Sequence, residues 1–121
     1  MPNVLVIDDD KPLREMILQL LTREGIDAVG AADGKEALKK LDEQAFDLLI
    51  TDIVMPDMEG LELITHLRKA CPDLPVIAIS GGARIGPESY LEMARMLGAR
   101  HTFQKPMAPA ALMTAIRDCL E

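Results

Sequence analysis

The sequence predicts an α/β domain built on a five-stranded parallel sheet with helices on both faces. Five short apolar runs alternate with five segments in which apolar residues recur at helical spacing. Strict alternation of strand and helix favours parallel strands joined by right-handed crossovers, with the helices covering both faces of the sheet. Four of the apolar runs also end on a polar or charged side chain, which suits such a sheet because ligands bind at the carboxyl ends of its strands.

The first half of the chain contains three expected strands and two expected helices. The helices are marked at their starts, because Asp10 and Asp33 are favourable N-caps, and Gly25 ends the first helix. The expected strands cover residues 4–7, 28–31 and 46–52, and the expected helices cover residues 11–24 and 34–43.

The second half continues the alternation with a third helix, a strand over 76–79, a helix from Pro87 to about Leu97, a strand over 102–104 and a final helix. Gly98 is the expected C-cap of the fourth helix. Together the ten elements predict a doubly wound, flavodoxin-like (βα)5 fold. The side chains expected to be buried are Leu61, Ile64 and Leu67 in the third helix, and Leu112, Ala115, Ile116 and Cys119 in the last.

The chain has 121 residues, so we expect one domain over residues 1–121 with no output domain after it. The formal net charge of -7 argues against a nucleic-acid-binding surface and against adsorption to an anionic membrane. The two cysteines, Cys71 and Cys119, are too few for a disulfide framework and indicate a reducing compartment. No apolar stretch approaches the ~20 residues of a membrane span, and we therefore expect a cytoplasmic protein.

Charged and hydroxyl side chains follow four of the five expected strands. Asp8 and Asp9 follow the first strand, Asp52 the third, Ser80 the fourth and Lys105 the fifth. Because the carboxyl ends of parallel strands share one edge, these side chains are expected to converge. Clustered carboxylates repel one another, and Mg²⁺ relieves the repulsion through its preference for oxygen ligands. With Asp52 as nucleophile, Ser80 as hydroxyl donor and Lys105 as cation, the set predicts transfer of a phosphoryl group to Asp52.

Each of these residues also has a purely structural interpretation. On this interpretation Asp8–Asp10 are helix caps without a further role. Asp52 is a turn residue, because aspartate is common in turns, and Lys105 is a solvated surface residue. Ser80-Gly81-Gly82 can be a simple loop, since the sequence has no glycine-rich phosphate-binding motif. Suitable side chains at four successive positions along one edge favour the functional interpretation.

Over its whole length the chain resembles a response-regulator receiver domain of two-component signalling. The resemblance rests on an ordered set of residues: Asp8-Asp9, Asp52 in Thr51-Asp52-Ile53-Val54-Met55-Pro56, Gly60, Ser80, Gly98-Ala99 and Lys105-Pro106.

The resemblance implies a role for each matching residue. Asp52 is then the phospho-acceptor, and Ser80 and Lys105 bind the phosphoryl oxygens. The Lys105–Pro106 peptide bond is expected to be cis. The Mg²⁺ ligands that the resemblance implies are Asp9, Asp52, the backbone carbonyl of Val54 and, largely through water, Asp8.

The resemblance also implies a switch rather than an enzyme. The expected phosphoryl donor is a sensor histidine kinase, a phosphotransfer protein or a small acyl phosphate, and slow hydrolysis resets the switch. The 81–86 loop is expected to move, and a downstream protein to bind the face formed by the fourth helix, fifth strand and fifth helix. The Tyr90, Met93 and Met96 side of the fourth helix either packs beneath loops or joins that surface, which also allows a phosphorylation-dependent dimer.

Two positions depart from the family pattern. Thr102 stands where an aromatic side chain usually reports phosphorylation, and alternation along the strand predicts that Phe103 packs in the core. The usual coupling between a hydroxyl and an aromatic switch is therefore left open. Met107 stands where phenylalanine often follows the Lys-Pro pair, and the two side chains have similar volumes.

Two other functions stay open from the sequence. A phosphohydrolase with an aspartyl intermediate usually carries a second aspartate two residues after the nucleophile, and that place is taken by Val54. A pseudo-receiver binds partners without being phosphorylated, and the complete set of acidic, serine and lysine residues disfavours it.

Overall fold

The structure is a computed structural model, and it describes residues 2–53, 60–80, 95 and 98–121. Within this part of the chain, five strands form one parallel sheet in the order β2-β1-β3-β4-β5. The predicted helix over 87–97 lies outside the described residues, apart from the helical residue Arg95. The elements are β1 (Asn3–Ile7), α1 (Lys11–Arg23), β2 (Asp27–Ala31), α2 (Gly34–Glu43), β3 (Leu48–Asp52), α3 (Gly60–Ala70), β4 (Val76–Ser80), β5 (His101–Gln104) and α5 (Pro109–Leu120).

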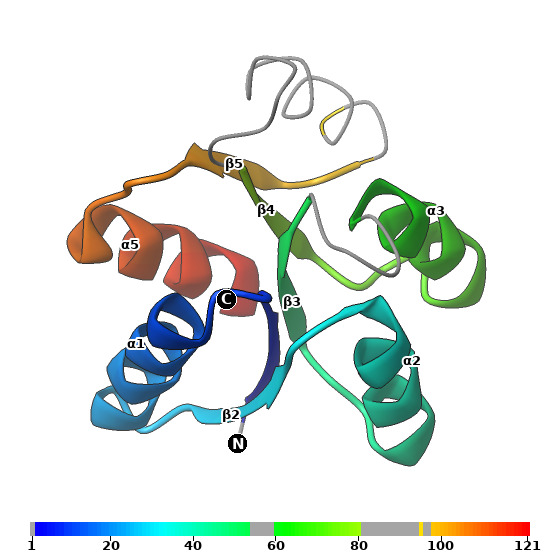
Figure 1. Cartoon of the computed structure of the whole chain (residues 1–121), viewed down its shortest axis with the longest axis horizontal. Coiled ribbons are helices and arrows are strands. Elements are labelled where there is room, and N and C mark those ends of the chain that lie inside the picture. The colour runs from blue at the N-terminus through cyan, green and yellow to red at the C-terminus, as the bar shows by residue number, and fades with distance from the viewer. Residues whose placement is uncertain (1, 54–59, 81–94, 96–97) are drawn as a thin grey trace.

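Helices cover both faces of the sheet (Figure 1). Helices α1 and α5 pack on one face, and α2 and α3 pack on the other. Because side chains alternate along a strand, neighbouring residues enter different cores: Val4 and Val6 join the α1/α5 core, whereas Leu5 and Ile7 join the α2/α3 core. The strand order is that of flavodoxin-like sheets, so the predicted doubly wound fold is confirmed.

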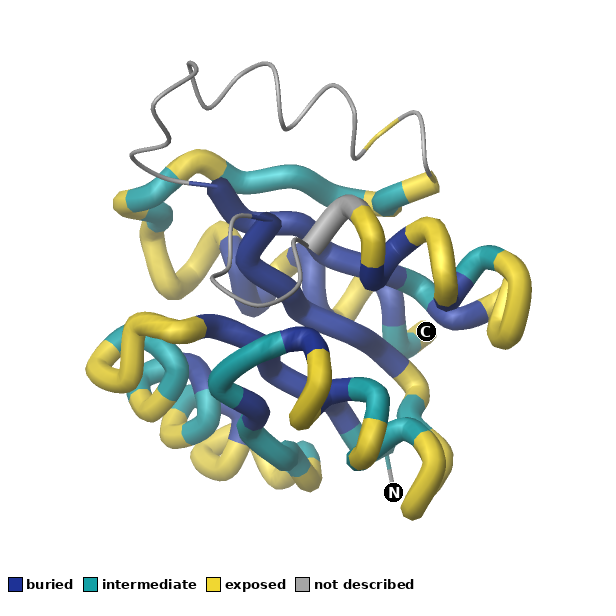
Figure 2. Tube along the Cα trace, turned by 45° about the vertical axis from the view of Figure 1, so that its right-hand side comes forward, coloured by how far each residue is buried: buried dark blue, intermediate teal, exposed yellow. Residues whose placement is uncertain are grey.

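The central strands are the most deeply buried part of the molecule (Figure 2). Strands β3 and β4 are buried along their whole length, whereas the edge strands β2 and β5 are only partly buried. Both cores are aliphatic, and Phe46 and Phe103 pack against them as partly buried side chains. Phe103 contacts the α1/α5 core, which confirms the placement predicted from strand alternation.

The register of the sheet brings the strand ends level with one another. Ile7 pairs with Thr51, Asp52 pairs with Ile79, and Ser80 pairs with Gln104. The residues that directly follow β1 and β5 therefore lie at the same edge as the last residues of β3 and β4. This edge is the one at which the sequence predicts the functional site.

Some predicted boundaries and burial positions were wrong. Strand β3 begins at Leu48 rather than at residue 46, and β5 begins at His101, because that residue already pairs with Ile77 of β4. In α3, Leu63 is fully buried beside the predicted Ile64 and Leu67. A helix on a sheet buries a stripe wide enough for adjacent residues, and the predicted buried stripe of α3 was too narrow because it left out Leu63.

Helix ends agree with the predicted caps. Asp10 accepts a hydrogen bond from the Leu13 N–H at 3.3 Å, and Asp33 accepts one from the Glu36 N–H at 2.9 Å. Gly25 has a φ of 73°, in the left-handed region that glycine tolerates after a helix.

Asp33→Ala is expected to lower the free energy of unfolding by about 1 kcal/mol, because the Glu36 N–H then loses its partner at the start of α2. Urea unfolding followed by circular dichroism measures the difference. Lys39→Ala on the exposed side of the same helix is the control, with an expected change within about 0.5 kcal/mol. Equal effects of the two substitutions would contradict the capping role.

Candidate functional site

The carboxyl ends of β1 and β3 bring three carboxylates together. Asp8 and Asp9 follow β1, and Asp52 is the last residue of β3. One carboxylate oxygen from each of the three residues lies within 4.8 Å of the other two. Asp8 and Asp52 are buried, with 1% and 5% of their surface exposed, whereas Asp9 is exposed. The three residues predicted to meet at this edge do so, and Asp9 forms the solvent-facing side of the cluster.

Lys105 supplies the positive charge of the cluster. Its Nζ lies 3.1 Å from Asp8 Oδ2 and 3.2 Å from Asp52 Oδ2. The backbone fixes its position, because the Lys105 N–H donates a hydrogen bond of 2.8 Å to the Ser80 carbonyl. The bond from Lys105 to Pro106 is cis, as expected. The lysine therefore reaches across the end of β4 and bridges the carboxylate that follows β1 and the carboxylate that ends β3.

Burial is the main reason that the pKa of Asp8 is raised to about 6. The Asp10 N–H, which donates to Asp8 Oδ1 at 2.9 Å, opposes this increase in pKa; the charge of Asp52 adds to it, and Lys105 opposes it. Burial lowers the pKa of Lys105, but the carboxylates of Asp52 and Asp8 outweigh burial and raise it. Lys105 therefore stays protonated at neutral pH, between two acids that compete for it.

The donor set fits a hard divalent cation. Asp8 Oδ2 is buried and, although it lies in ion-pair range of Lys105, it accepts no hydrogen bond within the described part of the chain. Three carboxylates against one ammonium leave excess negative charge in a confined site. Oxygen-preferring cations such as Mg²⁺ relieve that excess. Asp8, Asp9 and Asp52 are therefore the candidate ligands, while the predicted carbonyl ligand of Val54 lies outside the described residues.

Ser80 ends β4, beside the strand that carries Asp52. Its side chain is fully buried, and its Oγ has no hydrogen-bond partner among residues 2–53, 60–80, 95 and 98–121. A buried hydroxyl without a partner is costly, and such groups are often satisfied by a ligand or by water. In the β3–β4 register Asp52 is level with Ile79, so Ser80 lies one residue further toward the carboxyl edge. Its place suits the predicted role of a hydroxyl donor.

Arg14 supports the site, although no motif in the sequence points to it. Its Nη1 donates a hydrogen bond of 2.6 Å to the backbone carbonyl of Asp8. Gly30 of β2 makes room for the arginine, because a Cβ at that position would lie 3.3 Å from Arg14 Cδ and 3.1 Å from Leu18 Cδ1. An arginine in the second turn of α1 thus holds the backbone that presents the first carboxylate.

The predicted switch region is only partly described. The 81–86 loop and the Tyr90, Met93 and Met96 surface lie outside the described residues. Thr102, at the position of the usual aromatic residue, accepts a hydrogen bond of 3.3 Å from Arg95 Nε. Met107 packs partly buried against the α1/α5 core, as its apolar character suggests. A polar contact therefore occupies the place where the family usually carries an aromatic ring.

Fold and site together define the CheY-like class of α/β domains, in which a 2-1-3-4-5 sheet gathers acidic residues and a lysine at its carboxyl edge. The chain belongs to the response regulator receiver domain family, whose model matches residues 4–117. It is 31% identical to the chemotaxis protein CheY of Thermotoga maritima over 115 residues, which are 94% of this chain and 93% of that protein.

Comparisons with longer proteins and with solved structures also relate the chain to response regulators. The chain is 34% identical to the transcriptional regulatory protein GlrR of Escherichia coli over 98% of its own length, but it spans only about a quarter (26%) of that relative. A crystal structure of a CheY-like response regulator receiver domain protein from Methanospirillum hungatei superposes with a TM-score of 0.90 at 31% identity, covering 99% of this chain and 94% of that one.

Receiver domains of two-component systems are signalling switches that are generally not classed as enzymes, and Mg²⁺ and phosphoaspartate are typical of the family. None of the helices in the described residues has the length and apolarity needed to span a bilayer.

Proposed function

We propose that this chain is a phosphorylation-dependent switch of a two-component system in the cytoplasm, and that Asp52 accepts the phosphoryl group. The observation that carries the proposal is the contact of 3.2 Å between Asp52 Oδ2 and Lys105 Nζ, beside the carboxylates of Asp8 and Asp9. Neutral surroundings would favour a protonated, unreactive acid, whereas a neighbouring cation keeps a carboxylate ionised and nucleophilic.

Asp9, Asp52 and the carbonyl of Val54 would hold Mg²⁺ directly, with Asp8 acting through water. When bound, the cation neutralises charge on the acidic cluster and on phosphoryl oxygens. The Asp10 N–H donates to the Asp8 side chain, and Arg14 donates to the Asp8 carbonyl. Both contacts would help to orient Asp8 toward a water molecule on the cation.

In the transfer step, a carboxylate oxygen of Asp52 forms a bond to phosphorus as the bond from phosphorus to the donor breaks. The donor is a phosphohistidine of a sensor kinase or phosphotransfer protein, and its imidazole nitrogen leaves with the bonding electron pair. Lys105 and the Ser80 hydroxyl would stabilise the phosphoryl oxygens. Hydrolysis of the acyl phosphate returns the carboxylate and resets the switch.

The added charge is expected to draw Lys105 and Ser80 toward the phosphoryl group. The 81–86 loop follows Ser80 directly, so a shift of that serine biases the loop and the following helix toward a second arrangement. A downstream protein then reads the face formed by the 87–97 helix, β5 and α5. Self-association on the same face would give a phosphorylation-dependent dimer.

Intact-mass measurement after incubation with Mg²⁺ and acetyl phosphate tests the proposal. The wild-type protein is expected to gain the mass of one phosphate, and Asp52→Asn or EDTA is expected to abolish the gain. Asp47→Asn, at an exposed aspartate before β3, is the matched control and should leave the gain unchanged. A wild-type protein that gains no mass would instead support a pseudo-receiver, and rapid steady-state phosphate release from many substrates would support a phosphohydrolase.

A further inference from the structure

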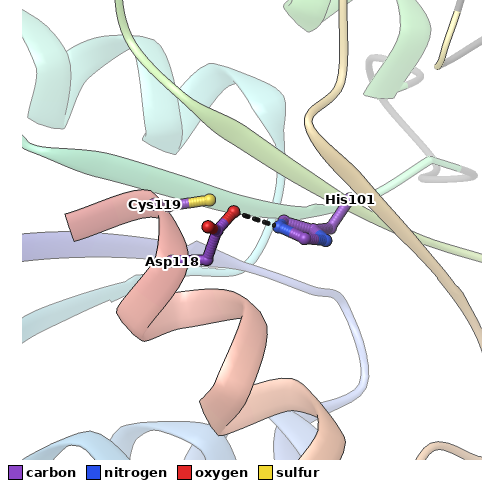
Figure 3. Close-up of side chains that lie close together, drawn as sticks. All are labelled: His101, Asp118 and Cys119. Carbon is purple, nitrogen blue, oxygen red and sulfur yellow. Dashed lines mark hydrogen bonds and ion pairs between the residues drawn. The ribbon is translucent and has the colours of Figure 1, made fainter. Parts of the chain in front are cut away.

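Figure 3 shows three side chains of different chemistry close together. They lie at the end of the sheet opposite the carboxylate cluster. His101 is the first residue of β5, and Asp118 and Cys119 lie in the last turn of α5. His101 Nε2 lies 2.7 Å from Asp118 Oδ2. One ligand atom from each of the three residues lies within 4.8 Å of the other two. Nitrogen, oxygen and sulfur donors are therefore already gathered within one small volume.

The fold anchors two of the three donors, and the exposed Asp118 is held by its contact with His101. Cys119 is 7% exposed and packs in the α1/α5 core with Ile116. His101 pairs with Ile77, which belongs to the same core, so its side chain lies on the face that α5 covers. Because both elements are anchored in one core, the backbone already holds the three residues together, which lowers the cost of ordering the donors when a ligand binds.

We propose that His101, Asp118 and Cys119 form a binding site for Zn²⁺ or a chemically similar divalent cation. Imidazole nitrogen, carboxylate oxygen and thiolate sulfur are the three donor types that Zn²⁺ accepts. Metal–donor bonds of about 2.0–2.3 Å require tetrahedral ligands to lie roughly 3–4 Å apart, so shifts of about 1 Å in side-chain position complete the site. The fourth coordination position is left to water.

Binding exchanges existing interactions for metal bonds. The hydrogen bond between His101 and Asp118 gives way as both residues become ligands, and the Cys119 thiol loses its proton to the buffer as the metal–sulfur bond forms. Burial raises the pKa of this thiol, with Arg100 opposing and Asp118 adding to that effect. Arg100 Nε also lies 3.7 Å from Asp118 Oδ2, so its charge competes with the cation and limits affinity.

A hollow with acidic walls lies on the Cys119 side of the cluster. Cys119 and Arg100 line a hollow of about 450 Å³ at this end of the sheet. Asp47 and Asp73 line the same hollow, and acidic walls raise the local concentration of cations. Once bound, the metal would join the last turn of α5 to the first residue of β5. It would stabilise the folded state by an amount that grows with the logarithm of the metal concentration above the dissociation constant.

Titration with Co²⁺ in excess Mg²⁺ tests the site, because Mg²⁺ occupies the all-oxygen cluster and only a thiolate gives sulfur-to-cobalt charge-transfer absorption. One Co²⁺ per monomer is expected, with that near-ultraviolet band and the strong visible bands of tetrahedral cobalt, and Zn²⁺ should displace it. Cys119→Ser is expected to abolish the charge-transfer band. His101→Gln is expected to weaken Co²⁺ binding more than about tenfold.

The chain carries matched controls, because it has two cysteines and two histidines, and one residue of each type lies outside the cluster. Cys71→Ser and His66→Gln remove exposed side chains and should leave the absorption and the affinity unchanged. Arg100→Gln should tighten binding because it removes the competing charge. His101→Gln also serves if Cys119→Ser fails to fold, because His101 is only partly buried. The proposal is overturned by the lack of a charge-transfer band in wild-type protein, by a band that needs Cys71, or by one metal shared between two chains.

Discussion

Lys105→Ala is expected to slow phosphoryl uptake from acetyl phosphate by about 100-fold without weakening Mg²⁺ binding. Loss of one preorganised positive donor at a site of developing negative charge typically costs a rate of this order. Mg²⁺ affinity should instead increase, because an ammonium lying 3.1 Å from Asp8 and 3.2 Å from Asp52 repels the cation. The opposite signs of the two effects distinguish a role in phosphoryl transfer from a general loss of structure.

The rate constants for Lys105→Ala come from intact mass as a function of time, and the Mg²⁺ affinities from isothermal titration. Lys11→Ala is the matched control, since Lys11 is exposed and pairs only weakly with Glu15 at 3.9 Å. An unchanged rate of uptake, or a loss of Mg²⁺ binding together with the rate, would contradict the role assigned to Lys105.

Asp8→Asn is expected to stabilise the metal-free protein at pH 8 by about 2 kcal/mol. The pKa of Asp8 in the folded protein, about 6, exceeds the ordinary aspartate value of 3.8. The carboxyl therefore favours folding fully below pH 3.8, and this contribution is lost as the pH rises through 6. A pKa difference of this size corresponds to about 3 kcal/mol, and we expect about 2 kcal/mol because solvent near Lys105 screens the charges.

Urea unfolding in EDTA at pH 4 and pH 8 measures the effect of Asp8→Asn. The gain in stability over wild type should be large at pH 8 and small at pH 4, and saturating Mg²⁺ should shrink it because only the wild-type site binds the cation well. Asp42→Asn, at an exposed position of α2, controls for the loss of a surface charge. A variant less stable than wild type at pH 8 would mean that the ion pair with Lys105 outweighs the cost of burying Asp8.

Much of the fold was predictable because the signals are local. Alternating apolar and amphipathic segments determine the element order, and Asp10, Asp33 and Gly25 mark helix ends through their own hydrogen bonds and backbone geometry. The burial of Leu63 and the early start of β5 were missed, since both depend on contacts with other elements rather than on local pattern.

The carboxylate cluster was predictable for a topological reason. In a parallel sheet every strand ends at the same edge, so residues as distant as Asp8 and Lys105 meet without any further information. The hydrogen bond from Arg14 to the Asp8 carbonyl was not predictable, because it depends on the close approach of α1 to Gly30. The meeting of His101 with Cys119 likewise depends on where the last turn of α5 lies relative to the start of β5.

Locating the phosphoryl group on the chain tests the role of Asp52 directly. Protein treated with acetyl phosphate and Mg²⁺ is reduced with borohydride, which converts an aspartyl phosphate to homoserine, and is then sequenced by tandem mass spectrometry. We expect homoserine at position 52 and unmodified aspartate at positions 8 and 9. Homoserine at Asp8 or Asp9, or at none of the three, would contradict the role of Asp52.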